Sequence, residues 1–133
     1  MKFGLFLLLA LLVAGCATSA VPPQPLWGVW GGQHVGLTLG TIDSAIEYDC
    51  AKGMIIGPVI VRDDGNFEAF GTHTPGQGGP DRIDHVPPSY PARYSGMVRG
   101  DVMTLVVDVA AIGARIGPYA LRRGAEPSLL RCL

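Results

Sequence analysis

The side chains that could do chemistry gather in one unusual segment, residues 73–91. It contains five prolines and three glycines, and its only other apolar side chains are those of Ile83, Val86 and Tyr90. Histidine and carboxylate groups together can bind zinc and related ions. This segment offers four such groups, on His73, Asp81, Asp84 and His85. Their spacings match no compact metal motif, so we expect neither a metal nor a cofactor here.

The same segment is better explained as a surface loop that contacts a partner. It has too few apolar side chains to bury itself, and its prolines prevent regular pairing with a neighbouring strand. A loop of this length within a compact domain is usually functional or disordered. We therefore predict a candidate binding loop, and its most suitable contact residues are His73, Asp81, Arg82, His85 and Tyr90.

Catalytic templates are missing from the sequence. It contains no G-x-S-x-G, no H-E-x-x-H and no P-loop motif. Lys52 is the only lysine beyond Lys2. The neighbouring carboxyls of Asp63 and Asp64 fall in a predicted turn, where such residues favour turn formation. The sequence thus favours a non-catalytic protein over an enzyme that uses the histidine-containing loop.

The N-terminus of the 133-residue chain has the character of a targeting segment. A basic Lys2 precedes an apolar stretch, residues 3–13, which is too short for the roughly 20 residues of a membrane span but fits a secretory signal. Residues 12–16 then read LVAGC, which resembles a bacterial lipobox. The alternative is an ordinary signal peptide cleaved at the small residues Ala14 and Gly15.

The lipobox resemblance implies a lipid anchor on Cys16. In such lipoproteins a diacylglyceryl group is transferred to the cysteine sulfur, the signal is cleaved before the cysteine, and palmitate or another acyl chain is added to its amine. Several acyl chains make a durable anchor. Ala17 resembles the class sorted to the outer membrane, facing the periplasm. We expect a signal peptide over residues 1–15, a Pro-rich tether over 16–25 and one β domain over 26–133.

The net charge of the chain and its remaining two cysteines fit a protein that faces the periplasm. Without Lys2, nine basic residues stand against eleven acidic ones, which excludes binding of nucleic acid through bulk electrostatics. Cys50 and Cys132 form an even pair in an oxidising compartment. A bridge would close a loop of about 83 residues and stabilise the domain by roughly 4–5 kcal/mol. The alternative is two buried free thiols.

Glycine and proline recur so often that the domain must be built from strands. From Leu26 onward the longest intervals that lack both are residues 41–52 and 101–112, each of twelve residues, which excludes long helices. Side chains alternate between apolar and polar along several short stretches. The strands that we expect are 35–39, 46–50, a hairpin of 59–62 with 67–72, a second hairpin of 92–99 with 102–109, 116–122 and 129–133. They predict an all-β fold, a small antiparallel barrel or sandwich of about eight strands, with one long Pro/Gly-rich loop.

Residues 44–52 admit two interpretations. Ser44 and Glu47 match a capping box, which would begin a short helix over 45–52. The same residues also alternate as a strand, with Ile46, Tyr48 and Cys50 on one face. We favour the strand.

Two resemblances to known families follow from short motifs. Gly28-Val29-Trp30 resembles the G-x-W of lipocalins and related small barrels, in which the Trp closes one barrel end against an Arg from a late strand. Arg122 or Arg123 would supply that Arg here.

Tyr48-Asp49-Cys50 and Cys132 resemble the disulfide-linked ends of periplasmic lysozyme-inhibitor lipoproteins. Those proteins carry a Ser-Gly-x-x-Tyr loop, whereas this chain has Tyr94-Ser95-Gly96 in the reverse order. The likeness is confined to the two ends of the chain and the lipobox.

Taken together, these features predict an envelope lipoprotein that acts as a non-catalytic binding module. Its partners would be the membrane, through the lipid anchor, and an extracytoplasmic protein. One alternative is an inhibitor of a cell-wall hydrolase, which needs a protruding loop. Another is a carrier of a small apolar ligand, which needs a partly empty interior.

Overall fold

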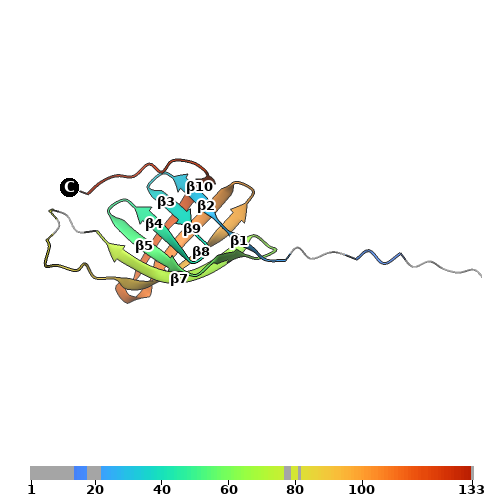
Figure 1. Cartoon of the computed structure of the whole chain (residues 1–133), viewed down its shortest axis with the longest axis horizontal. Helices are drawn as coiled ribbons and strands as arrows, with labels where there is room; N and C mark the ends of the chain where they lie inside the picture. Colours follow the sequence, from blue (N-terminus) through green and yellow to red (C-terminus); the bar gives the residue numbers. More distant parts are fainter. Residues whose placement is uncertain (1–13, 18–21, 77–78, 81, 133) are drawn as a thin grey trace, which may run out of the picture.

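The structure, a computed structural model, describes residues 14–17, 22–76, 79–80 and 82–132. Eight antiparallel strands form a closed barrel (Figure 1). They are β2 (Gly28–Gly32), β3 (Val35–Leu39), β4 (Asp43–Tyr48), β5 (Ala51–Ile56), β7 (Asn66–Pro75), β8 (Tyr90–Arg99), β9 (Val102–Val109) and β10 (Ala114–Arg123). A two-stranded sheet joins β1 (Gln24–Leu26) to β6 (Val59–Val61), and a 3-10 turn, η1 (Ala110–Ile112), precedes β10.

Each barrel strand pairs with the barrel strand before and after it in the chain, and β10 closes the circle by pairing with β2. Closure therefore leaves the barrel without an edge strand. The predicted all-β barrel of about eight strands is confirmed. The hairpin of residues 92–99 and 102–109 is also confirmed, because β8 and β9 pair from Arg99–Val102 to Arg93–Asp108.

Inward-facing side chains fill the barrel. On β9 the alternation places Met103, Leu105, Val107 and Val109 inside, each fully buried. Trp30 and Tyr94 are the largest of the fully buried side chains that join them. Burial of this apolar surface stabilises the barrel at roughly 25 cal/mol per Å².

The register defines two ends of the barrel. At the tether end, Gly28 pairs with Leu39 and Asp43 pairs with Ile56, so the chain enters here through β1. At the loop end lie the β2–β3 turn, the β4–β5 turn and the long β7–β8 loop, residues 76–89. Figure 1 shows β1 at the tether end, and the β7–β8 loop and the end of the C-terminal tail at the other.

The structure corrects the interpretation of residues 44–52. The alternative helix over 45–52 is wrong, and the favoured strand is right only as far as Tyr48. Asp49 and Cys50 form the turn to β5, and Cys50 adopts a left-handed φ of 62°. Cys50 therefore does not share the inward face of Ile46 and Tyr48.

Two other strand predictions also need correction. The 59–62 segment does not form a hairpin with 67–72, because β6 pairs with β1 while β7 pairs with β5. The tail is not a strand over 129–132, and Leu133 lies outside the described residues. Since β10 already pairs on both sides, no barrel edge remains free for a ninth strand.

The N-terminal predictions fall mostly on residues 1–13 and 18–21, which lie outside the described residues. The first strand begins at Gln24, within the expected tether of residues 16–25 and two residues before the expected start of the domain. Within the described residues, no helix is long and apolar enough to span a bilayer.

Candidate functional site

The C-terminal tail (residues 125–132) runs back over the outside of the barrel after β10. Its path is set by Gly31 and Gly36, which pair across β2 and β3. A Cβ on Gly31 would collide with the backbone of Ala125, and one on Gly36 would collide with the ring of Pro127. The two glycines therefore create the strip against which the tail packs.

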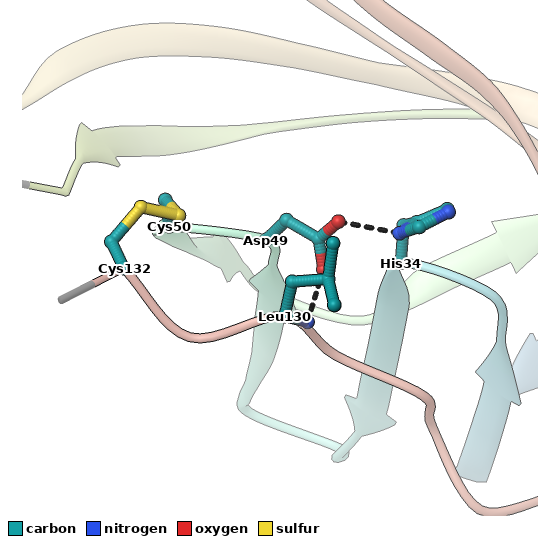
Figure 2. The surroundings of a disulfide bond; sticks show 5 residues. All are labelled: His34, Asp49, Cys50, Leu130 and Cys132. Atoms are coloured by element: carbon teal, nitrogen blue, oxygen red, sulfur yellow. Dashed lines mark hydrogen bonds and ion pairs between the residues drawn. A yellow bond between two sulfur atoms is a disulfide. The ribbon is translucent and has the colours of Figure 1, made fainter.

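At the loop end the tail is fixed to two hairpin turns. Ser128 O accepts a hydrogen bond from His34 N in the β2–β3 turn at 2.7 Å. Leu130 N donates to Oδ1 of Asp49 in the β4–β5 turn at 2.6 Å. Oδ2 of the same carboxylate lies 2.5 Å from His34 Nδ1, so Asp49 joins the tail to both turns (Figure 2).

A disulfide between Cys50 and Cys132 completes the attachment of the tail (Figure 2). The two Cα atoms are 5.1 Å apart, and the two residues are 82 positions apart in the sequence. The predicted bridge is confirmed, and the alternative of two free thiols is wrong. Cys16 is an exposed free cysteine, as required of a residue that would carry lipid.

Sequence reasoning missed the contribution of His34. It lies in a turn with a left-handed φ of 71°, and 46% of its side chain is exposed. Only the register, which pairs Val35 with Tyr48, brings His34 beside Asp49. No local pattern could have identified this pair.

A groove of about 920 Å³ lies between the C-terminal tail and the β7–β8 loop. The base of the loop is held by Thr74 Oγ1, which donates to Ser89 Oγ at 3.1 Å. The loop begins beside the disulfide because Gly76 N donates to Cys50 O at 2.6 Å. The groove therefore has one wall from the loop and one from the tail.

Basic side chains predominate among the charged groups that line the groove. They are those of Lys52, Arg82 and Arg131, against the single carboxylate of Glu47 among the described residues. None of the three cations forms an ion pair within the part of the chain that the structure describes. Elsewhere in the domain, four arginines are each paired with a carboxylate: Arg62, Arg93, Arg115 and Arg123. Cations without such partners are available to an anionic ligand.

The structure divides the predicted contact residues. Arg82 and His85 both line the groove, and Asp81 lies outside the described residues. His73 and Tyr90 do not belong to the loop, because they pair with each other in β7 and β8. The loop predicted over residues 73–91 therefore covers only 76–89. The alternation of inward-facing and outward-facing side chains that begins at Phe67 continues along β7 as far as His73.

His73 is instead part of a polar cluster inside the loop end of the barrel. Its ring lies 5.6 Å from that of Tyr48, which stacks on Tyr119 at 5.9 Å. Tyr94 Oη donates to Thr72 O at 2.5 Å. Burial is the main cause that raises the pKa of the Tyr48 hydroxyl and lowers the pKa of His73. Among the described residues, no three His, Cys, Asp or Glu side chains are placed to hold a metal.

We predict that His73 makes the barrel sensitive to mild acid. Its pKa is lowered in the folded protein, so below about pH 6.5 the unfolded chain binds a proton that the folded chain does not. The free energy of unfolding should therefore fall as the pH drops from 7.5 to 5, by at most about 1.4 kcal/mol per pH unit from this group.

Urea unfolding across this range should show that His73→Phe lacks this part of the pH dependence, because phenylalanine keeps an aromatic ring at the position but has no group that titrates. The matched control is His85→Phe, since His85 is exposed in the loop. Equal pH dependence in wild type and His73→Phe would show that His73 carries no such effect.

At the tether end, Trp30 and Arg123 form a cation–π contact. The guanidinium carbon of Arg123 lies 4.4 Å from the centre of the Trp30 ring. Arg123 is also bound to Asp101, with Nε 3.1 Å from Oδ1. Of the two arginines expected to lie against this Trp, the structure selects Arg123.

No family model matches the chain, and neither the curated proteins nor the solved structures contain a match to it. The candidate site is therefore defined by geometry alone. It is a groove at the loop end with three cations that form no ion pair among the described residues, and its walls are joined to the barrel by the disulfide and by Asp49.

Proposed function

We propose that this protein is a lipid-anchored envelope protein whose groove binds an acidic segment of an extracytoplasmic partner, without catalysis. The observation that carries the proposal is the convergence of Lys52, Arg82 and Arg131 on one groove. Arginine binds carboxylates through paired hydrogen bonds, and a carboxylate-bearing segment would give all three cations a partner.

The position of the groove also favours this function. The groove is at the loop end of the barrel, whereas the N-terminal segment enters at the tether end. A lipid on Cys16 would therefore leave the groove open to the surrounding compartment. The packed interior, with Trp30 and Tyr94 fully buried, favours binding on the outside over a ligand carried inside.

Binding of a defined acidic peptide tests the proposal. A fluorescent peptide of alternating Glu and Gly should bind the detergent-solubilised protein, more weakly as salt is raised, while a Lys and Gly peptide should not bind. The triple variant Lys52→Gln, Arg82→Gln, Arg131→Gln should lose at least about tenfold in affinity, since each charged hydrogen bond contributes roughly 1 kcal/mol or more.

The matched control for this test is Arg62→Gln, Arg99→Gln and Arg115→Gln, which also removes three basic side chains but from outside the groove. Its affinity should equal that of wild type. Equal loss in the two variants would mean that net charge alone attracts the peptide. Undiminished binding by the triple variant would contradict the groove as the site. Addition of the protein to a cell-wall hydrolase would separate an inhibitor from other binding modules.

Removal of the loop gives a second prediction. Residues 73–75 and 90–91 are paired in β7 and β8, so a Gly/Ser connector should replace only residues 77–88. Because loop-closure entropy changes by only about 0.6 kcal/mol per twofold change in length, the melting temperature should move little. Peptide binding should be lost, since one wall of the groove is gone. A variant that fails to fold, measured by circular dichroism, would show that the loop is packed structure.

Anchoring is tested at Cys16. In cells labelled with palmitate, wild type should incorporate label and Cys16→Ser should not, because serine offers no thiol for the diacylglyceryl group. Equal labelling of the two proteins would contradict lipid attachment at this residue.

A further inference from the structure

Four exposed apolar side chains surround the tether end of the barrel. They are Trp27, Ile42, Ile56 and Val102, and the first three are between 68% and 77% exposed. We name this set the tether-end rim. Groups of exposed apolar side chains on a small soluble domain commonly mark a contact surface.

The register places all four at the same end. Trp27 directly precedes Gly28, which pairs with Leu39 at the start of the β3–β4 turn. Ile42 lies in that turn, and the next residue, Asp43, pairs with Ile56.

Val102 opens β9 and pairs with Arg122, next to Arg123, which pairs with Trp30 near the start of β2. The rim therefore follows the barrel mouth from β2 through β5 and returns at β9.

The length of the N-terminal segment limits which surface the rim can contact. Cys16 precedes the first residue of β1, Gln24, by eight positions. A fully extended chain covers at most about 3.5 Å per residue, so a lipid on Cys16 would lie within about 28 Å of Gln24. β1 ends at Leu26, immediately before Trp27, so the tether end is the part of the barrel held closest to the bilayer.

The chemistry of the rim suits a lipid surface. Trp concentrates where bilayer headgroups meet acyl chains, and aliphatic side chains bury into that boundary. Arg123 pairs with Asp101 and Arg62 pairs with Asp64 at this end. The remaining exposed charges there also balance in number, with two basic and two acidic side chains: Arg99, Arg122, Asp43 and Asp63. Neither sign of charge therefore opposes contact with the headgroups.

We propose that the tether-end rim lies in the headgroup region of the membrane, so that the barrel stands on the bilayer with its groove facing away. This inference rests on the proposed lipid anchor at Cys16. It adds a second, non-covalent contact that orients the protein.

Fluorescence of Trp27 tests the proposal directly. The chain has two tryptophans, and the other, Trp30, is fully buried. The lipidated protein, with acylation of Cys16 verified by mass spectrometry, is reconstituted into phosphatidylethanolamine–phosphatidylglycerol vesicles with brominated acyl chains. Trp27 emission should fall about twofold relative to unbrominated vesicles. Trp27→Phe, which retains only Trp30, should show no comparable fall.

Two matched variants locate the contact. Ile42→Ser with Ile56→Ser should reduce the quenching and increase access of aqueous iodide to Trp27. Ile83→Ser with Val86→Ser changes apolar residues on the loop that are even more exposed, and it should leave both measurements unchanged.

Three results would overturn the proposal. Acylated protein whose Trp27 is unquenched by bromine and remains open to iodide would exclude the rim contact alone and leave the anchor intact. Absence of acyl chains on Cys16 would contradict both the rim contact and the lipid anchor. If Cys16→Ser protein in solution is dimeric by sedimentation and Ile42→Ser with Ile56→Ser makes it monomeric, the rim is covered by a second copy.

Discussion

Replacement of both disulfide cysteines, Cys50→Ala with Cys132→Ala, should lower the free energy of unfolding by about 4–5 kcal/mol. The bridge joins residues 82 positions apart, so most of its effect comes from restricting the unfolded chain. Natural domains of this size are stable by roughly 5–15 kcal/mol, so the loss is a large part of the total. Urea unfolding under oxidising conditions measures it as a lower midpoint.

The folded barrel should nevertheless keep its shape without the bridge. Ser128 remains bonded to the β2–β3 turn and Leu130 to Asp49, while closure of β10 on β2 involves neither cysteine. Wild type treated with a reductant should lose the same stability, which separates the bridge from side-chain effects. A double variant as stable as oxidised wild type would contradict the predicted contribution of the bridge.

The same double substitution should also weaken peptide binding in the groove. The last residues of the tail, including Arg131, are held there by the bridge and by the Asp49 bond to Leu130. Asp49→Asn, which keeps the bridge and leaves Oδ1 as an acceptor, is the matched control, and it should retain most peptide binding.

The barrel was predictable where alternation and turn residues agree. β9 alternates over eight residues, and Gly100-Asp101 lies between it and β8, so both strands and their pairing follow from the sequence. The sequence of β6 does not indicate its partner strand, because a strand of three residues can pair with any neighbour. Its partner, β1, is hidden in a proline-rich stretch that contains Pro25, a residue tolerated in a strand only where its missing N–H is not needed.

The candidate site was predictable only in part. Composition correctly indicated a loop, and Arg82 and His85 do line a groove. The prediction that His73 belongs to the loop is wrong, because it gives the prolines that follow His73 more weight than the alternation of Phe67, Ala69 and Gly71. The second wall of the groove required the tail to return over Gly31 and Gly36, a contact between segments about 90 residues apart that no local pattern describes.

The second large effect is expected at Trp30. Trp30→Ala should lower the free energy of unfolding by about 3–5 kcal/mol, because a fully buried indole is replaced by a cavity. Arg123→Ala should cost less, because cation–π contacts and exposed ion pairs each contribute about 1 kcal/mol. Urea unfolding of both single variants and the double variant gives the coupling between the two side chains. It should be about 0.5–1 kcal/mol, and a value near zero would contradict an energetic role for the contact.

Trp30→Phe separates packing from hydrogen bonding at this position. Trp30 Nε1 is buried and has no hydrogen-bond partner among the described residues. An unpartnered donor in an apolar interior carries a desolvation penalty of about 1–3 kcal/mol, which phenylalanine removes. The smaller ring leaves some space unfilled, so the two effects oppose each other, and Trp30→Phe should change the free energy of unfolding by less than about 1.5 kcal/mol. A loss close to that of Trp30→Ala would instead mean that the whole indole volume is required to close the tether end of the barrel.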